Sequence, residues 1–114
     1  MKKYRETDLV RQCLELLQLR GIPAYRQNQG GMTAEYKGKA RFIKFAGAKG
    51  ISDIIGIVPP NGRYLAVECK MPGNKPTEDQ TLFLDKIKSC GGLAVVVTSI
   101  QELNDFLDKE AGNQ

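Results

Sequence analysis

The sequence predicts a single α/β domain in which helices flank a mixed β-sheet. Three observations predict this class. Apolar residues recur at helical spacing near the N-terminus. Two apolar runs are joined by a loop that contains Asn61-Gly62, which is a hairpin signal. Residues 93–98 form a Val-rich run typical of a strand buried on both faces. Because 114 residues suffice for one core, we expect one domain over residues 1–114, with its core at about 5–109.

The first half of the chain is expected to begin with a helix. Leu9, Cys13 and Leu17 lie on one helical face, and Gly21 with Pro23 just beyond it ends the helix. After the helix we expect a short strand, a polar and basic loop, an extended segment and a small glycine-rich segment. These elements cover residues 5–20, 22–28, 30–39, 41–45 and 46–50.

The second half is expected to contain a hairpin, a helix, a strand and a last helix. Thr77 and Gln80 form a capping-box pair at the start of the first of these helices, and a glycine pair ends it. Ser99 and Glu102 form a similar pair before the last helix. The five elements cover residues 53–58, 64–70, 77–90, 93–98 and 99–109.

Charge and residue types exclude several classes of function. The first 50 residues carry eleven Lys or Arg against four Asp or Glu, and the rest carry six against nine, so the basic half favours a polyanionic partner. The absence of histidine excludes Ser-His-Asp triads and zinc sites built on imidazole. Cys13, Cys69 and Cys90 lack metal-ligand spacing, so we expect free thiols in a reducing compartment. With neither a long apolar run nor a signal peptide, we expect a cytoplasmic protein that binds no membrane.

The predicted hairpin brings two carboxylates together. If its centre lies between Pro60 and Asn61, Asp53 lies directly across from Glu68 on one face of the sheet. Opposed side chains have Cβ atoms about 4.5–5.5 Å apart, and like charges there are destabilising. Lys70 shares this face because side chains two residues apart on a strand point the same way. The hairpin therefore predicts two acids and an amine at one end of the sheet.

A third carboxylate, Glu6, falls on the apolar stripe of the first helix, where an unpaired charge is costly. Carboxylate oxygens without histidine or thiolate suit Mg²⁺, which accepts one or two carboxylates together with waters and a substrate phosphate. Such a cation removes the repulsion between carboxylates and activates a bound water. Lys70 would then orient that water or stabilise charge on the phosphoryl group. These residues predict phosphodiester hydrolysis that depends on Mg²⁺ or Mn²⁺.

Each of these residues also has a purely structural interpretation. Glu68 and Lys70 alone would form a solvated pair at a strand end, and Asp53 would mark a turn. Glu6 would complement the dipole of the first helix, and Gln80 would serve as a capping residue. The functional interpretation depends on the combination of Asp-x14-Glu-x-Lys across a hairpin with a helix that bears an acid.

The order Asp53, Glu68, Cys69, Lys70 resembles the PD-(D/E)XK nuclease signature, with Ser52 where that pattern often has proline. Within that superfamily the chain resembles the VRR-NUC (virus-type replication-repair nuclease) family over nearly its whole length. The matching positions are Glu6, Arg26 to Gly30, Gly50 to Asp53, Glu68 to Lys70, and Gln80. Gln29 departs from the family pattern, in which we expect a smaller residue such as threonine.

The resemblance implies a restriction-endonuclease-like αβββαβ core and a structure-selective DNA nuclease. The residues that it implies around a divalent ion are Glu6, Asp53, Glu68 and Cys69 through its backbone carbonyl. The residues that it implies in catalysis are Asp53, Glu68, Lys70 and Gln80, the last two near the attacking water. Stand-alone members from phages and bacteria are similar to Holliday-junction resolvases that work as homodimers. We therefore expect Mg²⁺ or Mn²⁺, branched DNA and a second copy of the chain as partners, and no nucleotide cofactor.

The basic half would then contact the phosphate backbone. The residues expected to bind DNA lie before or beside the carboxylates: Arg26, Asn28, Lys37, Lys39, Arg41, Lys44 and Lys49. If they instead serve only solubility, they carry no function. Two other hypotheses stay open: an inert nuclease-fold module that binds DNA or assembles with other proteins, and a nuclease that acts on flaps or DNA ends.

Overall fold

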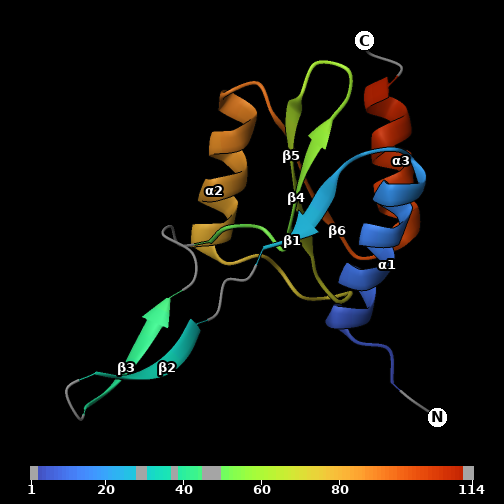
Figure 1. Cartoon of the computed structure of the whole chain (residues 1–114). Helices are drawn as coiled ribbons and strands as arrows, with labels where there is room; N and C mark the ends of the chain where they lie inside the picture. The colour runs from blue at the N-terminus through green and yellow to red at the C-terminus, as the bar shows by residue number, and fades with distance from the viewer. Residues whose placement is uncertain (1–2, 28–30, 37–38, 45–49, 112–114) are drawn as a thin grey trace.

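The structure, a computed structural model, describes residues 3–27, 31–36, 39–44 and 50–111, and in the two middle ranges it describes the backbone. Its helices and strands follow one another along the chain (Figure 1) as α1 Glu6–Leu19, β1 Ala24–Arg26, β2 Gly31–Tyr36, β3 Lys39–Lys44, β4 Ile54–Val58, β5 Arg63–Cys69, α2 Glu78–Ser89, β6 Leu93–Val97 and α3 Ile100–Ala111. Outside residues 30–39, every predicted helix and strand is present, with its ends close to the predicted bounds.

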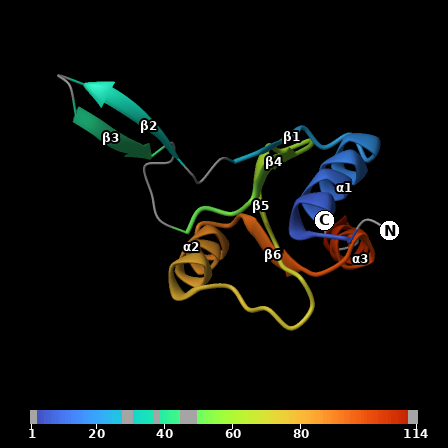
Figure 2. The ribbon, with the colours of Figure 1, turned by 90° about the horizontal axis from the view of Figure 1, so that it is seen from below.

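Four strands form one mixed sheet in the order β1-β4-β5-β6. β4 is antiparallel to both β1 and β5, whereas β5 and β6 are parallel and are connected through α2. Helices α1 and α3 lie on one face of this sheet, and α2 lies on the other (Figure 2). The predicted class, a mixed sheet flanked by helices, is confirmed.

Alternate residues of β5 bury opposite faces of the sheet, as strand geometry requires. Leu65 and Val67 belong to an apolar cluster that also contains Leu9 of α1 and Leu103 of α3. A second cluster joins the other face of the sheet to α2 and contains Ile55, Ala66 and Leu84. Because both faces are covered, residues 65–69 of β5 are all buried, Glu68 among them.

The prediction of a polar, basic loop over residues 30–39 is wrong. Gly31–Tyr36 and Lys39–Lys44 form an antiparallel two-stranded sheet, β2-β3, with Gly31 paired to Lys44 and Tyr36 to Lys39. This hairpin is separate from the main sheet and projects away from it (Figure 1). The glycines and lysines of the segment favour a loop, but residues 32–36 alternate between apolar and polar types, and pairing with residues 39–44 satisfies their backbone groups.

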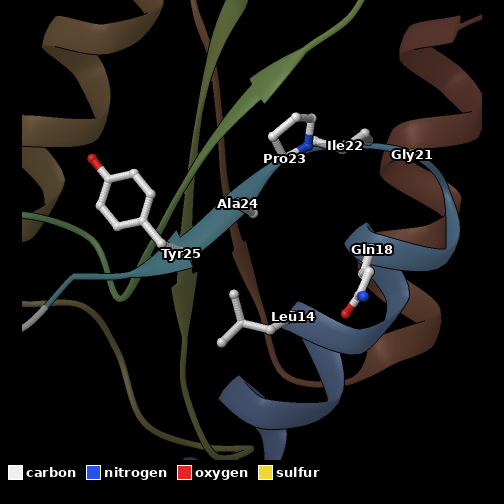
Figure 3. A pocket seen from close by; sticks show the side chains of 7 residues that line it. All are labelled: Leu14, Gln18, Gly21, Ile22, Pro23, Ala24 and Tyr25. Carbon is white, nitrogen blue, oxygen red and sulfur yellow. The ribbon is translucent and has the colours of Figure 1, made fainter.

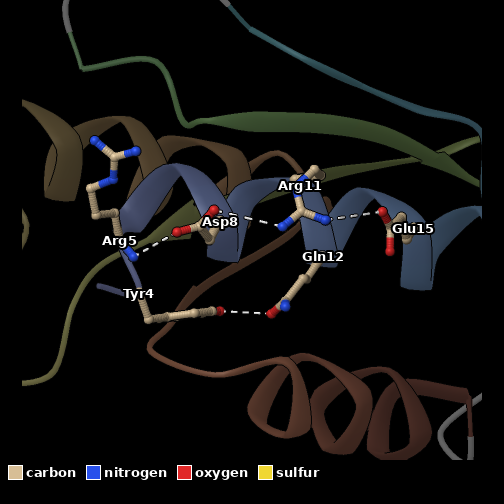
Figure 4. A network of polar contacts seen from close by, with 6 residues as sticks. All are labelled: Tyr4, Arg5, Asp8, Arg11, Gln12 and Glu15. Carbon is tan, nitrogen blue, oxygen red and sulfur yellow. Dashed lines mark hydrogen bonds and ion pairs between the residues drawn. The ribbon is translucent and has the colours of Figure 1, made fainter. Parts of the chain in front are cut away.

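The start of α1 is fixed by local polar contacts (Figure 4). The backbone N–H of Arg5 donates to Oδ2 of Asp8 at 2.8 Å, which satisfies a backbone donor beside the first turn. The Arg11 guanidinium lies 3.6 Å from Asp8 and 3.4 Å from Glu15. These are exposed pairs worth little individually. The contact between Arg5 and Asp8 instead defines where the helix begins, and therefore where Glu6, its first residue, lies.

Candidate active site

Two acidic residues meet where β4 begins and β5 ends. Ile54 pairs with Val67, so the next position along the hairpin sets Asp53 against Glu68, which is the predicted register. The Asp53 carbonyl oxygen accepts a hydrogen bond from the Gln27 N–H at 2.8 Å, which extends the pairing between β1 and β4. Asp53 Oδ2 accepts a second one from the backbone N–H of Cys69 at 2.8 Å. The Asp53 carboxylate is thereby fixed to the strand that carries Glu68.

Glu68 is almost completely buried, with 1% of its surface exposed. Its Oε2 lies 3.6 Å from Nζ of Lys70 and accepts a hydrogen bond from Nε2 of Gln80 at 3.1 Å. Its Oε1 is buried and receives no hydrogen bond from the residues that the structure describes. The Lys70 side chain is itself only 14% exposed. The interpretation of Glu68 and Lys70 as a solvated pair is therefore wrong.

Burial raises the pKa of Glu68 to about 8. The negative charge of Asp53 raises this pKa further, the ammonium of Lys70 lowers it, and the charge of Glu6 raises it slightly. Two neighbouring carboxylates repel each other, so the protonated form of the buried Glu68 is favoured. Without a cation, the site therefore holds a proton near neutral pH. Strongly shifted pKa values of this kind are typical of functional sites.

Glu6 approaches this pair from α1. It is half-buried, and its charge contributes to the raised pKa of Glu68. Within the described part of the chain, however, no three His, Cys, Asp or Glu side chains gather closely enough to form a metal-binding group. Asp53 and Glu68 thus form the centre of the site, and Glu6 lies at its edge. That Glu6 and the Cys69 carbonyl ligate a metal stays a prediction.

Gln80 combines two roles that the sequence presented as alternatives. Its Oε1 accepts a hydrogen bond from the Thr77 N–H at 2.8 Å, and its own N–H donates to Oγ1 of Thr77 at 3.2 Å, so the predicted capping box is present. The Nε2 of the same side chain reaches Glu68. The start of α2 is therefore part of the site.

Ser52 and Gly50 lie in the segment that carries the family resemblance, but the sequence did not predict the contacts that they make. Ser52 is fully buried, and its Oγ donates to the carbonyl oxygen of Ile54 at 3.0 Å, which shapes the turn that carries Asp53. Gly50 has a φ of +74° and lies against the first turn of α2. A Cβ atom there would lie 2.3 Å from the carbonyl oxygen of Asp79 and 2.7 Å from the backbone nitrogen of Gln80. The glycine-rich character of residues 47–50 was the available signal.

We expect Gly50→Ala to destabilise the protein more than Gly21→Ala does. Gly21 has the same φ of +74° but open space around its Cα, so alanine there costs only the left-handed strain, roughly 1–2 kcal/mol. Alanine at Gly50 adds a clash with backbone atoms of α2, which must shift. Urea unfolding of both variants measures the difference in the free energy of unfolding. Equal losses would mean that the contact between Gly50 and α2 is not tight.

The residues predicted to bind DNA are distributed over several parts of the chain. Arg26 is exposed on β1, one residue before the Gln27 that pairs with Asp53. Three of the remaining residues lie on β3: Lys39, Arg41 and Lys44. Three others lie outside the described residues: Asn28, Lys37 and Lys49. Their contacts with DNA stay predictions.

A separate pocket of about 470 Å³ lies between α1 and β1 (Figure 3). Its lining residues are Leu14, Gln18, Gly21, Ile22, Pro23, Ala24 and Tyr25. In Figure 3 the Leu14 side chain extends from α1 toward β1, whereas the Tyr25 ring points away from α1. The lining of this pocket contains no acid, lysine or arginine, so the pocket offers no acid-base groups like those of the carboxylate pair.

The chain was compared with protein-family models, solved structures and curated proteins. The sequence model of the VRR-NUC domain family matches residues 5–101. A solved structure described as a VRR_NUC domain superposes with a TM-score of 0.62 and 19% sequence identity, and the match covers 90% of this chain and 94% of that one. No curated protein matches the chain. Among the described residues, no helix is long and apolar enough to span a bilayer.

Proposed function

The chain belongs to the VRR-NUC domain family, and on that premise we propose that it is a divalent-metal-dependent, structure-selective DNA endonuclease. The observation that carries this proposal is the buried Glu68 beside Asp53, with the Lys70 ammonium 3.6 Å from its carboxylate. An acid pair can hold a divalent ion that activates water, and an amine beside it can stabilise the charge that develops on the phosphate during hydrolysis.

The donor set fits Mg²⁺ or Mn²⁺. Glu68 Oε1 is buried without a hydrogen-bond donor from the described residues, and the Asp53 carboxyl group repels Glu68 unless a proton or a cation lies between them. Mg²⁺ commonly takes one or two carboxylates and fills its remaining positions with water and phosphate oxygens. Asp53 and Glu68 would hold the ion, and Glu6 and the Cys69 carbonyl would complete its surroundings.

A bound divalent ion supplies an activated water and neutralises charge on the phosphate. The protein groups around the ion position the carboxylates and stabilise charge. Lys70 is held by Glu68 at one side and is still partly exposed, so its ammonium can donate to a phosphate oxygen or to the attacking water. Gln80 keeps Glu68 in place through Oε2. Asp53 is fixed by the Cys69 N–H, so neither carboxylate has to reorganise during the reaction.

The proposed substrate is branched DNA, with the four-way junction as its first example. The excess of lysine and arginine in the first 50 residues favours contacts with phosphate over contacts with base edges. We propose that the active form is a homodimer, because paired cuts across a symmetric junction require two active sites related by a two-fold axis. The inert-module hypothesis is disfavoured, since Asp53, Glu68 and Lys70 are all present and in contact.

The proposal predicts cleavage of an end-labelled four-way junction in Mg²⁺ or Mn²⁺ and none in EDTA. A 5′ flap and a linear duplex of the same sequence are incubated in parallel, and the products are mapped on denaturing gels. Symmetric nicks in the junction would support the dimeric nuclease. Preferred cutting of the flap would show that the proposed substrate is wrong, whereas the proposed metal-dependent hydrolysis would stand. If folded protein binds DNA and cuts none of the three substrates in either metal, the chain is an inert binding module.

A further inference from the structure

The Gln80 amide connects Glu68 to the first turn of α2, and we propose that Gln80 is a positioning residue that holds Oε2 of Glu68 and so reserves Oε1 for the divalent ion. This inference rests on the proposed function, in which Glu68 binds a divalent ion. It assigns Oε1 of Glu68 to the ion and Oε2 to the hydrogen bond with Gln80. It also distinguishes Gln80 from a residue that acts directly on the attacking water.

The orientation of the amide is determined by its partners at both ends. Oε1 of Gln80 accepts from the Thr77 N–H at 2.8 Å, and Nε2 donates to Glu68 Oε2 at 3.1 Å. Rotating the amide by half a turn would set its NH₂ group against the Thr77 N–H and its carbonyl oxygen against the carboxylate. Both contacts would then be repulsive. The capping box therefore selects the orientation that presents a donor to Glu68.

The backbone of Gln80 is also held in place. Its N–H donates to Oγ1 of Thr77 at 3.2 Å, and Gly50 lies against the peptide that joins Asp79 to Gln80. Gly50 belongs to the segment that leads through Ser52 to Asp53. The first turn of α2 thus fixes Glu68 by a side-chain hydrogen bond and packs against the segment that leads to Asp53.

These contacts make the two oxygens of Glu68 unequal. Oε2 accepts a hydrogen bond from Gln80 at 3.1 Å and lies 3.6 Å from the Lys70 ammonium, so protein groups hold this oxygen. Oε1 is buried and has no donor from the described residues. Carboxylates that bind metals are usually held by such outer partners, and removing a partner typically costs 10–100-fold in metal affinity or activity. Gln80 fits this role better than a role in capping alone.

The test compares Gln80→Ala with Glu102→Ala. Glu102 is the matched control because its side chain and backbone also make hydrogen bonds to the residues just before a helix, here α3. Its N–H donates to Ser99 Oγ at 3.2 Å and its carboxylate accepts from Thr98, on a helix that covers the opposite face of the sheet. Both substitutions remove a capping side chain, and only the first removes a donor to Glu68. Mn²⁺ binding to the full chain is measured by calorimetry without DNA, alongside urea unfolding and junction cleavage.

We expect both variants to lower the urea midpoint, but only Gln80→Ala to weaken Mn²⁺ binding, by about 10–100-fold. Equal Mn²⁺ affinities of the two variants would overturn the inference and reduce Gln80 to a helix cap. Absence of Mn²⁺ binding by the unmodified chain would overturn it as well. If the unmodified chain binds Mn²⁺ but cuts no DNA, the proposed function fails, while a selective effect of Gln80→Ala would still support the positioning role.

Discussion

Replacing Lys70 by alanine is expected to abolish DNA cleavage while leaving the fold and DNA binding intact. The Lys70 ammonium lies 3.6 Å from Glu68 Oε2 and is partly exposed, so it can contact a phosphate bound at the carboxylate pair. Removing one donor that stabilises charge in a transition state costs about 100- to 1,000-fold in rate. A loss of this size is expected in single-turnover cleavage of the junction at saturating Mg²⁺.

The effect must be separated from a general loss of positive charge. Lys88→Ala is the matched control, because Lys88 is an exposed lysine in the last turn of α2, at the end of that helix away from Gln80. Fluorescence anisotropy in EDTA measures DNA binding for both variants, and we expect similar affinities. Lys70→Arg should recover only part of the rate, since a planar guanidinium cannot replace a compact ammonium held beside a buried carboxylate. Cleavage by Lys70→Ala at the unmodified rate would remove Lys70 from the mechanism.

The hairpin that carries the acids could be predicted because its determinants are local. Asn61-Gly62 marks the turn, and a hairpin centre between Pro60 and Asn61 sets the register, so the opposition of Asp53 and Glu68 follows. The capping box of α2 is equally local, since Thr77 and Gln80 are one helical turn apart. The sequence left open whether Gln80 caps α2 or contacts the carboxylate pair. The structure shows both contacts, because the amide oxygen accepts from Thr77 while the amide nitrogen donates to Glu68.

The parts that could not be predicted depend on contacts between distant segments. Gly50 packs against Asp79 and Gln80, and no local pattern indicates that a turn before β4 meets the start of α2. The position of Glu6 relative to Glu68 depends on how α1 lies across the sheet, which helical periodicity does not determine. The β2-β3 hairpin was missed because its glycines and lysines favour a loop, whereas its stability comes from pairing between strands.

The second large effect concerns Glu68 itself, and Glu68→Gln is expected to abolish cleavage and Mn²⁺ binding. Glutamine keeps the size of the side chain but offers the ion an amide oxygen without charge, which is a poor replacement for one of two carboxylate ligands. The loss should equal or exceed that of Lys70→Ala in the cleavage assay. Calorimetric titration with Mn²⁺ separates a failure to bind the ion from a failure of the chemical step.

The same substitution should change how stability depends on pH in the metal-free protein. The pKa of Glu68 is raised to about 8 in the folded state, against an ordinary value of 4.5. Between these values the folded state keeps a proton that the unfolded state has lost, so the stabilisation is complete below about pH 4.5 and is lost as the pH rises through about 8. Glu68→Gln has no such proton. In EDTA it should lose less stability than the unmodified protein between pH 5 and 8.5, and it should be the more stable of the two at the upper end.

Urea unfolding at several pH values tests this second effect, and Glu15→Gln is the control because Glu15 is exposed on α1, away from the carboxylate pair. That control should follow the unmodified protein at every pH. The gain in stability from Glu68→Gln at pH 8.5 is expected to be about 1–3 kcal/mol, the usual cost of a buried polar group left without a partner. Parallel stability profiles for Glu68→Gln and the unmodified protein would mean that Glu68 ionises normally when folded. The buried carboxylate would then need neither a proton nor a cation, and the physical argument for a divalent ion at this site would fail.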